Sequence, residues 1–298
     1  MRAVFVSRFG GPEVLELRDA PTPEAAEGEL LVDVEAIGVN YRDVYEREGS
    51  YGGEPPLIAG VEGAGRVRES GALVAWSSAQ GSYAEQIAVP AARAVPVPDG
   101  VSAELAAAAL MQGMTAHYLA TSTFPVQPGD QVLVHAAAGG VGLLLTQIVK
   151  LRGGRVVATT SSEEKAKLAR AAGADDVIGY DDVPEHEFAV VYDGVGKATF
   201  ARSLAALRPR GMLVLYGAAS GPVPPFDLME LERGGSLYVT RPSLRHYATP
   251  ERARELFDLM GAGKLDVRIG GRYPLEKARK AHEDLESRRT TGKSLLLP

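Results

Sequence analysis

The sequence predicts an α/β protein in which a mainly β domain accompanies a doubly wound parallel sheet. Its 298 residues exceed one ordinary hydrophobic core, so the length favours two domains that share a cleft. Up to about Gly113 the chain reads as short strands separated by turns. From Met114 onward, apolar runs of strand length alternate with helical periodicity, which is the order expected of βαβ units.

The first part consists of short apolar runs with turn residues between them. The segment from Arg66 to Trp76 reads as a hairpin that turns at Ser70 and Gly71. Further strands are expected in the runs AVFV, LEL, LLVDVEAIGV and YAEQIAV. This part is therefore predicted to be mainly β.

The second part should form the parallel sheet, with strands in the runs QVLVH, RVVATT, DDVI, AVVYDG, MLVLYG and SLYVT. Helices are expected over 140–151 and 163–172, because Gly153 and Gly173 are placed to cap their carboxyl ends. A helix over 250–260 and a last strand, KSLLLP, follow, and we interpret this tail as returning to the first domain. The predicted domains are 1–113 with 263–298, and 114–262.

The composition disfavours several classes of protein. The net charge of -6 gives no broad positive surface for nucleic acid. The chain has no cysteine, which excludes disulfides and thiolate zinc ligands and agrees with a reducing cytoplasm. Its histidines show no metal-ligand spacing, so no metal is expected. No apolar run approaches the roughly 20 residues of a membrane span and the start lacks a signal peptide, so we expect a soluble, cytoplasmic protein.

The strongest local motif, AAAGGVG, follows the run QVLVH. Ala137, Gly139 and Gly142 occupy the three small positions of a dinucleotide fingerprint, which serve a tight turn, close approach of the pyrophosphate and helix–strand packing. The motif follows a predicted strand and opens a predicted helix, and this context distinguishes it from a merely flexible turn. It predicts a Rossmann domain with phosphates at a helix N-terminus.

The end of the second strand of this domain indicates the coenzyme. An NAD enzyme usually carries a carboxylate there for the ribose hydroxyls, whereas residues 159–162 are all threonine or serine. Glu163 and Glu164 follow at once, but Ser161 and Glu164 have the spacing of a helix capping box. Lys165 can offer a cation to a 2′-phosphate, so the pattern favours NADPH over NADH.

Two more glycine turns, at 193–196 and 216–221, each follow a predicted strand. Ligands of open α/β sheets bind at the carboxyl ends of strands, so these turns either line the same crevice or are ordinary loops.

With these motifs in place, the chain resembles the zinc-independent quinone oxidoreductases, the zeta-crystallin-like branch of the medium-chain dehydrogenase/reductases. The resemblance covers nearly the whole length. Its most specific segments are GVNYRDVYEREGSY at 38–51, GVEGAG at 60–65, HAAAGGVGL at 135–143, VVYDGVG at 190–196, SLYVTRPSL at 236–244 and the ending AHEDLESRRTTGKSLLLP. The resemblance implies a GroES-like first domain, a Rossmann domain that binds NADPH, a quinone or enone substrate, and a homodimer joined through Rossmann edge strands.

The resemblance also implies a set of coenzyme-binding residues. Asn40, Tyr41 and Tyr45 match a wall over the nicotinamide ribose, and Thr115 and Tyr118 match residues that face it. The remaining matches are Gly139, Gly140 and Val141 at the pyrophosphate, Ser161, Lys165 and Tyr180 at the 2′-phosphate, Gly194, Tyr216, Gly217, Ala218, Ala219, Arg241, Pro242 and Ser243 along the nucleotide, and Arg288 from the tail.

Hydride transfer from C4 of a nicotinamide needs a donor for the negative charge that develops on the acceptor oxygen. Tyr45, Tyr51 and Asn40 are the neutral donors that the sequence offers, with Asp43 to orient them. The alternative is that these tyrosines, half-buried at the edge of a domain, only pack against their neighbours and have no catalytic role.

The chain departs from the family pattern at two main places, and the segment at 247–251 is also shorter than in the family. The family continues further after GAG into a G-D-x-V strand, whereas here 66–76 returns in a short hairpin. Between DDVI and AVVYDG the family inserts a helix, and this chain has only 179–188, so we expect a thinly covered patch there. The alternatives to a quinone reductase are an NADPH-dependent 2-alkenal or enoyl reductase and a non-catalytic NADPH-binding protein, crystallin-like or RNA-binding.

Overall fold

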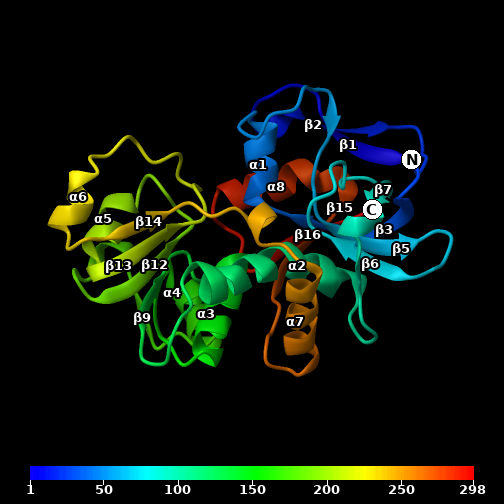
Figure 1. The fold of residues 1–298 in the computed structure, drawn as a ribbon. Coiled ribbons are helices and arrows are strands. Elements are labelled where there is room, and N and C mark those ends of the chain that lie inside the picture. Colours follow the sequence, from blue (N-terminus) through cyan, green and yellow to red (C-terminus); the bar gives the residue numbers. More distant parts are fainter. The chain divides into compact units, whose positions relative to one another are not determined.

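The computed structural model describes residues 1–298, which form two compact units. Unit 1 comprises 1–111 and 253–298, and unit 2 comprises 112–252 (Figure 1). The second division falls inside helix α7, Pro250–Gly261, ten residues before the boundary at 262 that the sequence indicated. The first falls inside helix α2, Ala103–Tyr118.

Unit 1 is built on a seven-stranded sheet of order β15-β16-β3-β5-β6-β8, in which β7 also pairs with β3, and a three-stranded sheet of order β2-β1-β4. Its core contains Trp76 and Tyr83 among valines and leucines from both sheets. The strands are β1 Arg2–Val6, β2 Leu15–Asp19, β3 Glu29–Val39, β4 Leu57–Ile58, β5 Gly63–Val67, β6 Leu73–Trp76, β7 Gln86–Pro90, β8 Val95–Pro96, β15 Ile269–Pro274 and β16 Lys293–Leu297, and the helices are α1 Tyr41–Arg47 and α8 Ala278–Glu286.

Two sequence-based expectations for this unit are confirmed. The tail returns to the first domain, because β16 pairs antiparallel with β3, Leu295 opposite Gly38. The hairpin over 66–76 is formed by β5 and β6, with Arg66 opposite Leu73.

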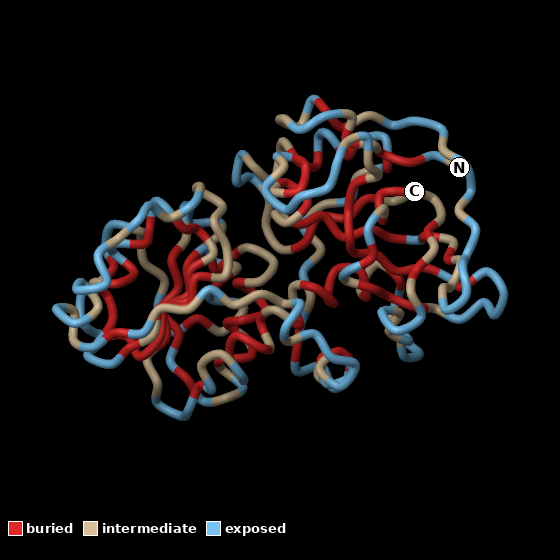
Figure 2. The backbone as a smooth tube through the Cα atoms, turned by 45° about the horizontal axis from the view of Figure 1, so that its top comes forward, coloured by how far each residue is buried: buried red, intermediate tan, exposed pale blue.

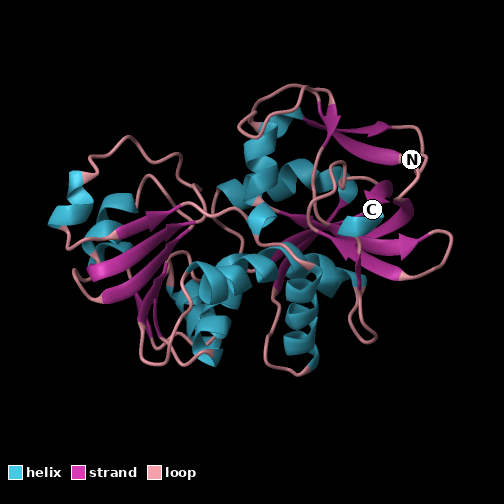
Figure 3. Ribbon diagram, in the orientation of Figure 1, coloured by secondary structure: helices cyan, strands magenta, loops and turns pink.

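Unit 2 contains a six-stranded, entirely parallel sheet of order β11-β10-β9-β12-β13-β14. Helices α3 and α4 pack on β9, β10 and β11, and α5 packs on β12 and β13 (Figure 3). All six residues of β12 are buried, as expected of a strand with both faces covered, and Figure 2 shows the strands as the buried centre of the unit. The elements are β9 Gln131–Val134, α3 Gly140–Leu151, β10 Arg155–Thr159, α4 Glu163–Ala171, β11 Asp176–Ile178, β12 Phe188–Asp193, α5 Phe200–Ala205, β13 Leu207–Leu215, α6 Met229–Arg233 and β14 Tyr238–Thr240.

The predicted ends of α3 and α4 are confirmed, because Gly153 and Gly173 have φ of +82° and +103°, the left-handed region that glycine adopts without strain. The predicted start of α4 at Glu163 is confirmed, but the predicted cap is wrong by one residue. Ser162, not Ser161, is the N-cap, and its hydroxyl accepts a hydrogen bond from the backbone of Lys165. Thr160 still donates its backbone N–H to the end of β11, so the chain stays extended past Ser161 and the Ser161–Glu164 capping box does not form.

The connection between β11 and β12 has no α-helix, as predicted. It contains one 3₁₀ turn, Tyr180–Asp182, before β12 begins at Phe188. None of the helices combines the length and the apolar sequence that crossing a bilayer requires.

Candidate functional site

The turn between β9 and α3 presents backbone N–H groups at the carboxyl edge of the parallel sheet. Gly139 is the extended N-cap and α3 begins at Gly140. The first N–H groups of a helix have no partner within the helix, so those of Gly140 and Val141 are free to bind an anion. The fingerprint residues therefore lie where a pyrophosphate would be held.

Close packing against backbone explains Gly142, and a side chain of α2 lies against Gly140. A Cβ on Gly142 would lie 2.6 Å from the carbonyl oxygen of Ala136 and 2.7 Å from Cα of Ala137, so only glycine allows the helix to lie against the turn. A Cβ on Gly140 would lie 1.8 Å from Oε1 of Gln112. Gln112, in α2, is a contact of the turn that the sequence analysis missed, since no local motif marks it.

A buried polar network fixes the strand ends beneath the turn. Ser203 donates its hydroxyl to Asp193 (2.8 Å) and so accepts from Nε2–H of His135 (3.0 Å). Nδ1 of His135 then accepts from the hydroxyl of Thr159 at 2.8 Å. Burial lowers the pKa of His135, which keeps the ring neutral in this arrangement. These contacts tie β9, β10, β12 and α5 together directly below the candidate coenzyme site.

The loops after β12 and β13 lie against each other. Gly194 accepts a hydrogen bond from the backbone of Ala219 (3.2 Å), and a Cβ on Gly217 would lie 2.5 Å from the carbonyl oxygen of Gly194. The ring of Tyr216 packs against Gly194 as well. Arg241, after β14, donates to the carbonyl of Leu215 at 2.9 Å. The structure thus brings together 194 and 216–219, and links Arg241 to the end of β13.

The three residues expected at a 2′-phosphate lie on two neighbouring segments. Nζ of Lys165 donates to the hydroxyl of Ser161 at 3.3 Å, and both are exposed or half-exposed. The hydroxyl of Tyr180 accepts from the backbone of Ala136 at 3.2 Å, and its ring stacks on His135. Ser161 and Lys165 are thus in contact, whereas Tyr180 supports the fingerprint turn.

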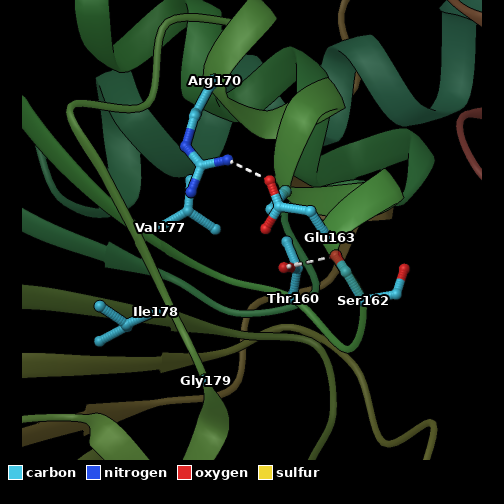
Figure 4. Close-up of a pocket in the computed structure, with 8 residues that line it drawn as sticks. Thr160, Ser162, Glu163, Arg170, Val177, Ile178 and Gly179 are labelled. Atoms are coloured by element: carbon cyan, nitrogen blue, oxygen red, sulfur yellow. Dashed lines mark hydrogen bonds and ion pairs between the residues drawn. The ribbon is translucent and has the colours of Figure 1, made fainter.

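A pocket of about 250 Å³ lies beside these residues, at the carboxyl ends of β10 and β11 (Figure 4). Its walls are Thr160 and Ser162, the side of α4 that carries Glu163 and Arg170, and residues 177–179.

The remaining expected residues of unit 2 lie in α2 and after β14. Tyr118 is buried and stacks on Tyr247 with ring centroids 4.4 Å apart. Arg252 donates to His117 and to the hydroxyls of Thr121 (3.1 Å) and Ser122 (2.9 Å), which fixes this end of α2. Three further expected residues are half-buried or exposed, Thr115, Pro242 and Ser243.

In unit 1, helix α1 carries a cluster of aromatic rings. Tyr45 lies 5.8 Å from Tyr41 and stacks on Tyr51 at 5.9 Å, measured between ring centroids. The guanidinium of Arg42 lies 5.3 Å from the centroid of Tyr51, and its Nη1 is buried with no hydrogen-bond partner. The sequence analysis did not single out Arg42, because a lone arginine beside polar neighbours looks like an ordinary surface residue.

Asn40 precedes α1 and belongs to a buried network. Its amide donates to the carbonyl of Gly38 (3.1 Å) and to Glu62 (2.9 Å). Its oxygen accepts from Nζ of Lys293 at 2.8 Å, and Lys293 forms a buried ion pair with Glu62 at 2.5 Å. Both amide hydrogens are donated within the protein, so the structure does not favour Asn40 as a hydrogen-bond donor to substrate. Glu62 and Lys293 were missed, because they meet only in the folded sheet.

Asp43 begins a second buried chain. It accepts from the backbone of Asn40 and from the hydroxyl of Tyr83, both at 2.9 Å. Arg47 can only donate, so Nδ1 of His282 accepts from it (3.2 Å) and Nε2–H donates to Tyr83 (3.0 Å). Burial raises the pKa of Asp43 to about 7 and lowers that of His282 to about 3. This chain ties α1 to α8.

Arg288, expected to reach the coenzyme, is exposed after α8 and has a φ of +59°. Burial raises the pKa of the Tyr41 hydroxyl, and the positive charge of Arg288 opposes the rise, so these two expected residues are neighbours. The structure shows no group of three or more histidine, cysteine, aspartate or glutamate side chains arranged to hold a metal ion.

Comparisons with known proteins agree with this architecture. Residues 26–99 match the family model described as alcohol dehydrogenase GroES-like domain, and residues 172–296 match the one described as zinc-binding dehydrogenase. The chain is 42% identical over 324 residues to a quinone oxidoreductase of Pseudomonas aeruginosa, covering 100% of this chain and 99% of that one. It is 35% identical over 328 residues to a 2-haloacrylate reductase of a Burkholderia species, covering 99% and 98%.

A mycobacterial structure complexed with NADPH superimposes with a TM-score of 0.96 at 48% identity and covers 100% of both chains. The GroES-like and Rossmann parts predicted from the sequence are thereby confirmed. The chain belongs to the quinone oxidoreductase family, a zinc-independent branch of the medium-chain dehydrogenase/reductases.

Proposed function

We propose that this protein transfers a hydride from NADPH to a quinone. The observation that carries the proposal is the turn at 136–142, where free backbone N–H groups and the close-packed Gly142 would form a pyrophosphate site. The chain is also similar over its full length to a quinone oxidoreductase and to a mycobacterial protein whose structure was determined with NADPH.

The residues of unit 2 fit NADPH. Gly139, Gly140 and Val141 would bind the pyrophosphate through backbone N–H groups, and Ser161 with Lys165 would bind the 2′-phosphate. Beyond these, unit 2 would line the nucleotide with Thr115, Tyr118, Tyr180, Gly194, 216–219 and 241–243. The family resemblance also assigns Tyr41, Tyr45 and Arg288 to the coenzyme. When bound, NADPH supplies a hydride from C4 of its nicotinamide.

On the substrate side, this chain's own residues would stabilise the negative charge that develops on the acceptor oxygen. Tyr45 and Tyr51 offer neutral hydroxyl donors, and Arg42 offers a full positive charge with an unpaired N–H beside them. Asp43 anchors the start of α1, on which Tyr41, Tyr45 and Arg42 lie. We assign Asn40 the role of holding Glu62 and Lys293 rather than that of a donor.

The test is oxidation of NADPH followed by absorbance with a 1,4-naphthoquinone as acceptor, with NADH as the comparison coenzyme. We expect quinone-dependent turnover and a preference for NADPH. Lys165→Ala should weaken the binding of NADPH far more than that of NADH, and equal losses would contradict the phosphate assignment. NADPH binding without turnover of any acceptor would favour a non-catalytic protein.

Arg42→Met tests the substrate side. Loss of one donor to a developing oxyanion lowers kcat by roughly 10²-fold or more, so kcat with the quinone should fall while the Kd for NADPH stays constant. The control is Arg279→Met, which removes an exposed arginine paired only with Glu283 on α8. An unchanged kcat in Arg42→Met would refute the role of Arg42.

A second candidate is an NADPH-dependent 2-alkenal or enoyl reductase, favoured by the similarity to a 2-haloacrylate reductase. The hydride would then go to the β-carbon, and the same donors would stabilise the charge on the carbonyl oxygen. Comparing kcat/KM for a quinone with that for a 2-alkenal decides between the two.

We also propose a cytoplasmic homodimer. β14 is an edge strand of the parallel sheet, and the segment that leads to and includes it exposes Leu228, Met229 and Tyr238. Sedimentation should give a dimer that Tyr238→Lys weakens. The absence of cysteine supports a reducing compartment, which cell fractionation would test.

A further inference from the structure

The pocket between α4 and β11 contains one ion pair on its wall. In Figure 4 the side chains of Glu163 and Arg170 point toward each other across the side of α4, and Nη1 of Arg170 lies 2.8 Å from Oε1 of Glu163. The other polar lining groups, at Thr160 and Ser162, carry no charge. The charge balance of the pocket is therefore set by these two residues.

Glu163 lies where its charge matters for a dinucleotide. It is the first residue of α4, at the carboxyl end of β10, two positions after Ser161 and two before Lys165. In Rossmann domains that bind NAD, a carboxylate in this region accepts hydrogen bonds from the ribose hydroxyls and repels a 2′-phosphate. An unneutralised Glu163 would therefore oppose NADPH.

We propose that Arg170 determines the coenzyme preference by neutralising Glu163, so that the adjoining Ser161–Lys165 site accepts a 2′-phosphate. This inference rests on the proposed use of NADPH. With Arg170 present, the carboxylate of Glu163 has an ion-pair partner, and α4 carries Glu163 and Glu164 against Lys165, Lys167 and Arg170. Without Arg170, the charge of Glu163 would lose that partner and stand beside a phosphate of about −1.5 to −2.

Stability does not explain the ion pair. The side chains of Arg170 and Glu163 are 50% and 69% exposed, and exposed pairs of this kind add little to the free energy of unfolding. Removal of Arg170 should thus leave the fold intact and act on the ligand. One uncompensated charge within about a Debye length of the phosphate, about 8–10 Å, should weaken NADPH binding about tenfold.

The experiment measures Kd for NADPH and NADH by nicotinamide fluorescence, at low and high salt, in four proteins: wild type, Arg170→Ala, Glu163→Gln and the double variant. Arg170→Ala should raise the Kd for NADPH about tenfold and leave that for NADH unchanged or lower. This loss of affinity for NADPH should be smaller at high salt, because salt screens the charge of Glu163. The double variant should bind NADPH within about twofold of Glu163→Gln alone, because Arg170 acts through Glu163.

Arg155→Ala is the matched control. Arg155 forms an equally exposed ion pair with Asp176, but at the amino end of β10, four residues and therefore about 13 Å from Thr159. It should leave the coenzyme preference unchanged.

Three outcomes would overturn the inference. Arg170→Ala could weaken NADPH and NADH equally, or leave a wild-type preference for NADPH unchanged. The double variant could keep the full loss of Arg170→Ala, in which case Arg170 binds the phosphate directly. A wild-type protein that binds neither coenzyme would instead overturn the proposed function, and the inference with it.

Discussion

Asp43 and His282 should give the stability of unit 1 two opposite dependences on pH. Both side chains are buried in one hydrogen-bonded chain through Tyr83. Asp43→Asn and His282→Gln each remove one titrating group and keep a polar side chain of similar size. Each substitution thus changes one titrating group of this hydrogen-bonded chain and leaves the other in place.

Whether each group raises or lowers stability with increasing pH follows from which state, folded or unfolded, binds its proton. The pKa of Asp43 is about 7 in the folded protein against 3.8 ordinarily, so between about pH 4 and 7 only the folded state holds this proton. Its contribution to stability is lost as pH rises, by about 1.4 kcal/mol per pH unit. The pKa of His282 is about 3 against 6.5, so between these values only the unfolded state is protonated, and stability is lost as pH falls. The two slopes cancel between about pH 4 and 6.5.

Each substitution should reveal the slope of the remaining group. Relative to wild type, Asp43→Asn should gain about 3 kcal/mol in free energy of unfolding between pH 4.5 and 6.5, and His282→Gln should lose about as much over the same range. Other titrating groups cancel in the difference between variant and wild type.

Urea unfolding followed by tryptophan emission measures this change in unit 1. Trp76 is the only tryptophan, and it is fully buried in the same core as Tyr83. Parallel pH profiles for wild type and both variants would refute the reasoning, because they would mean that neither group changes its pKa on folding.

Three further predictions concern unit 2. Gly142→Ala should abolish NADPH binding, since its Cβ would meet backbone atoms within 2.7 Å, whereas Gly261→Ala, with open space around it, should bind as wild type does by fluorescence titration. Ser203→Ala should lower the free energy of unfolding by about 1–3 kcal/mol in urea denaturation, because it leaves the buried Nε2–H of His135 without an acceptor and removes one hydrogen bond to the buried carboxylate of Asp193, and a loss near zero would contradict the network. Amides at 180–185 should exchange with deuterium faster than those of β12, and strong protection throughout would contradict the thin covering.

The sequence predicted the parallel sheet well, because each strand is a short apolar run and each helix is bounded by its own signals. Gly153 and Gly173 show this, since a left-handed glycine is a local requirement that local sequence can meet. The start of α4 was also predicted, but its N-cap was misplaced by one residue. Ser161 and Ser162 are chemically equivalent caps, and a contact with β11 decides between them.

The candidate site was only partly predictable. The fingerprint turn is contiguous, so its residues could be named from the sequence. Glu62 and Lys293 are 231 residues apart and become partners only when β16 pairs with β3. The sequence also could not show that both amide hydrogens of Asn40 are donated within the protein. A sequence shows which hydrogen-bonding groups exist, but not which of them already have partners.

The strand pairing of β3 constrains the order in which the protein can mature during synthesis. β16, at 293–297, is translated after all of unit 2, whose 112–252 form one contiguous stretch. Unit 2 can therefore fold on the ribosome while β3 still exposes an unpaired edge and Glu62 lacks its counterion. The nascent chain should be most vulnerable to proteases and to aggregation in the interval before Lys293 emerges.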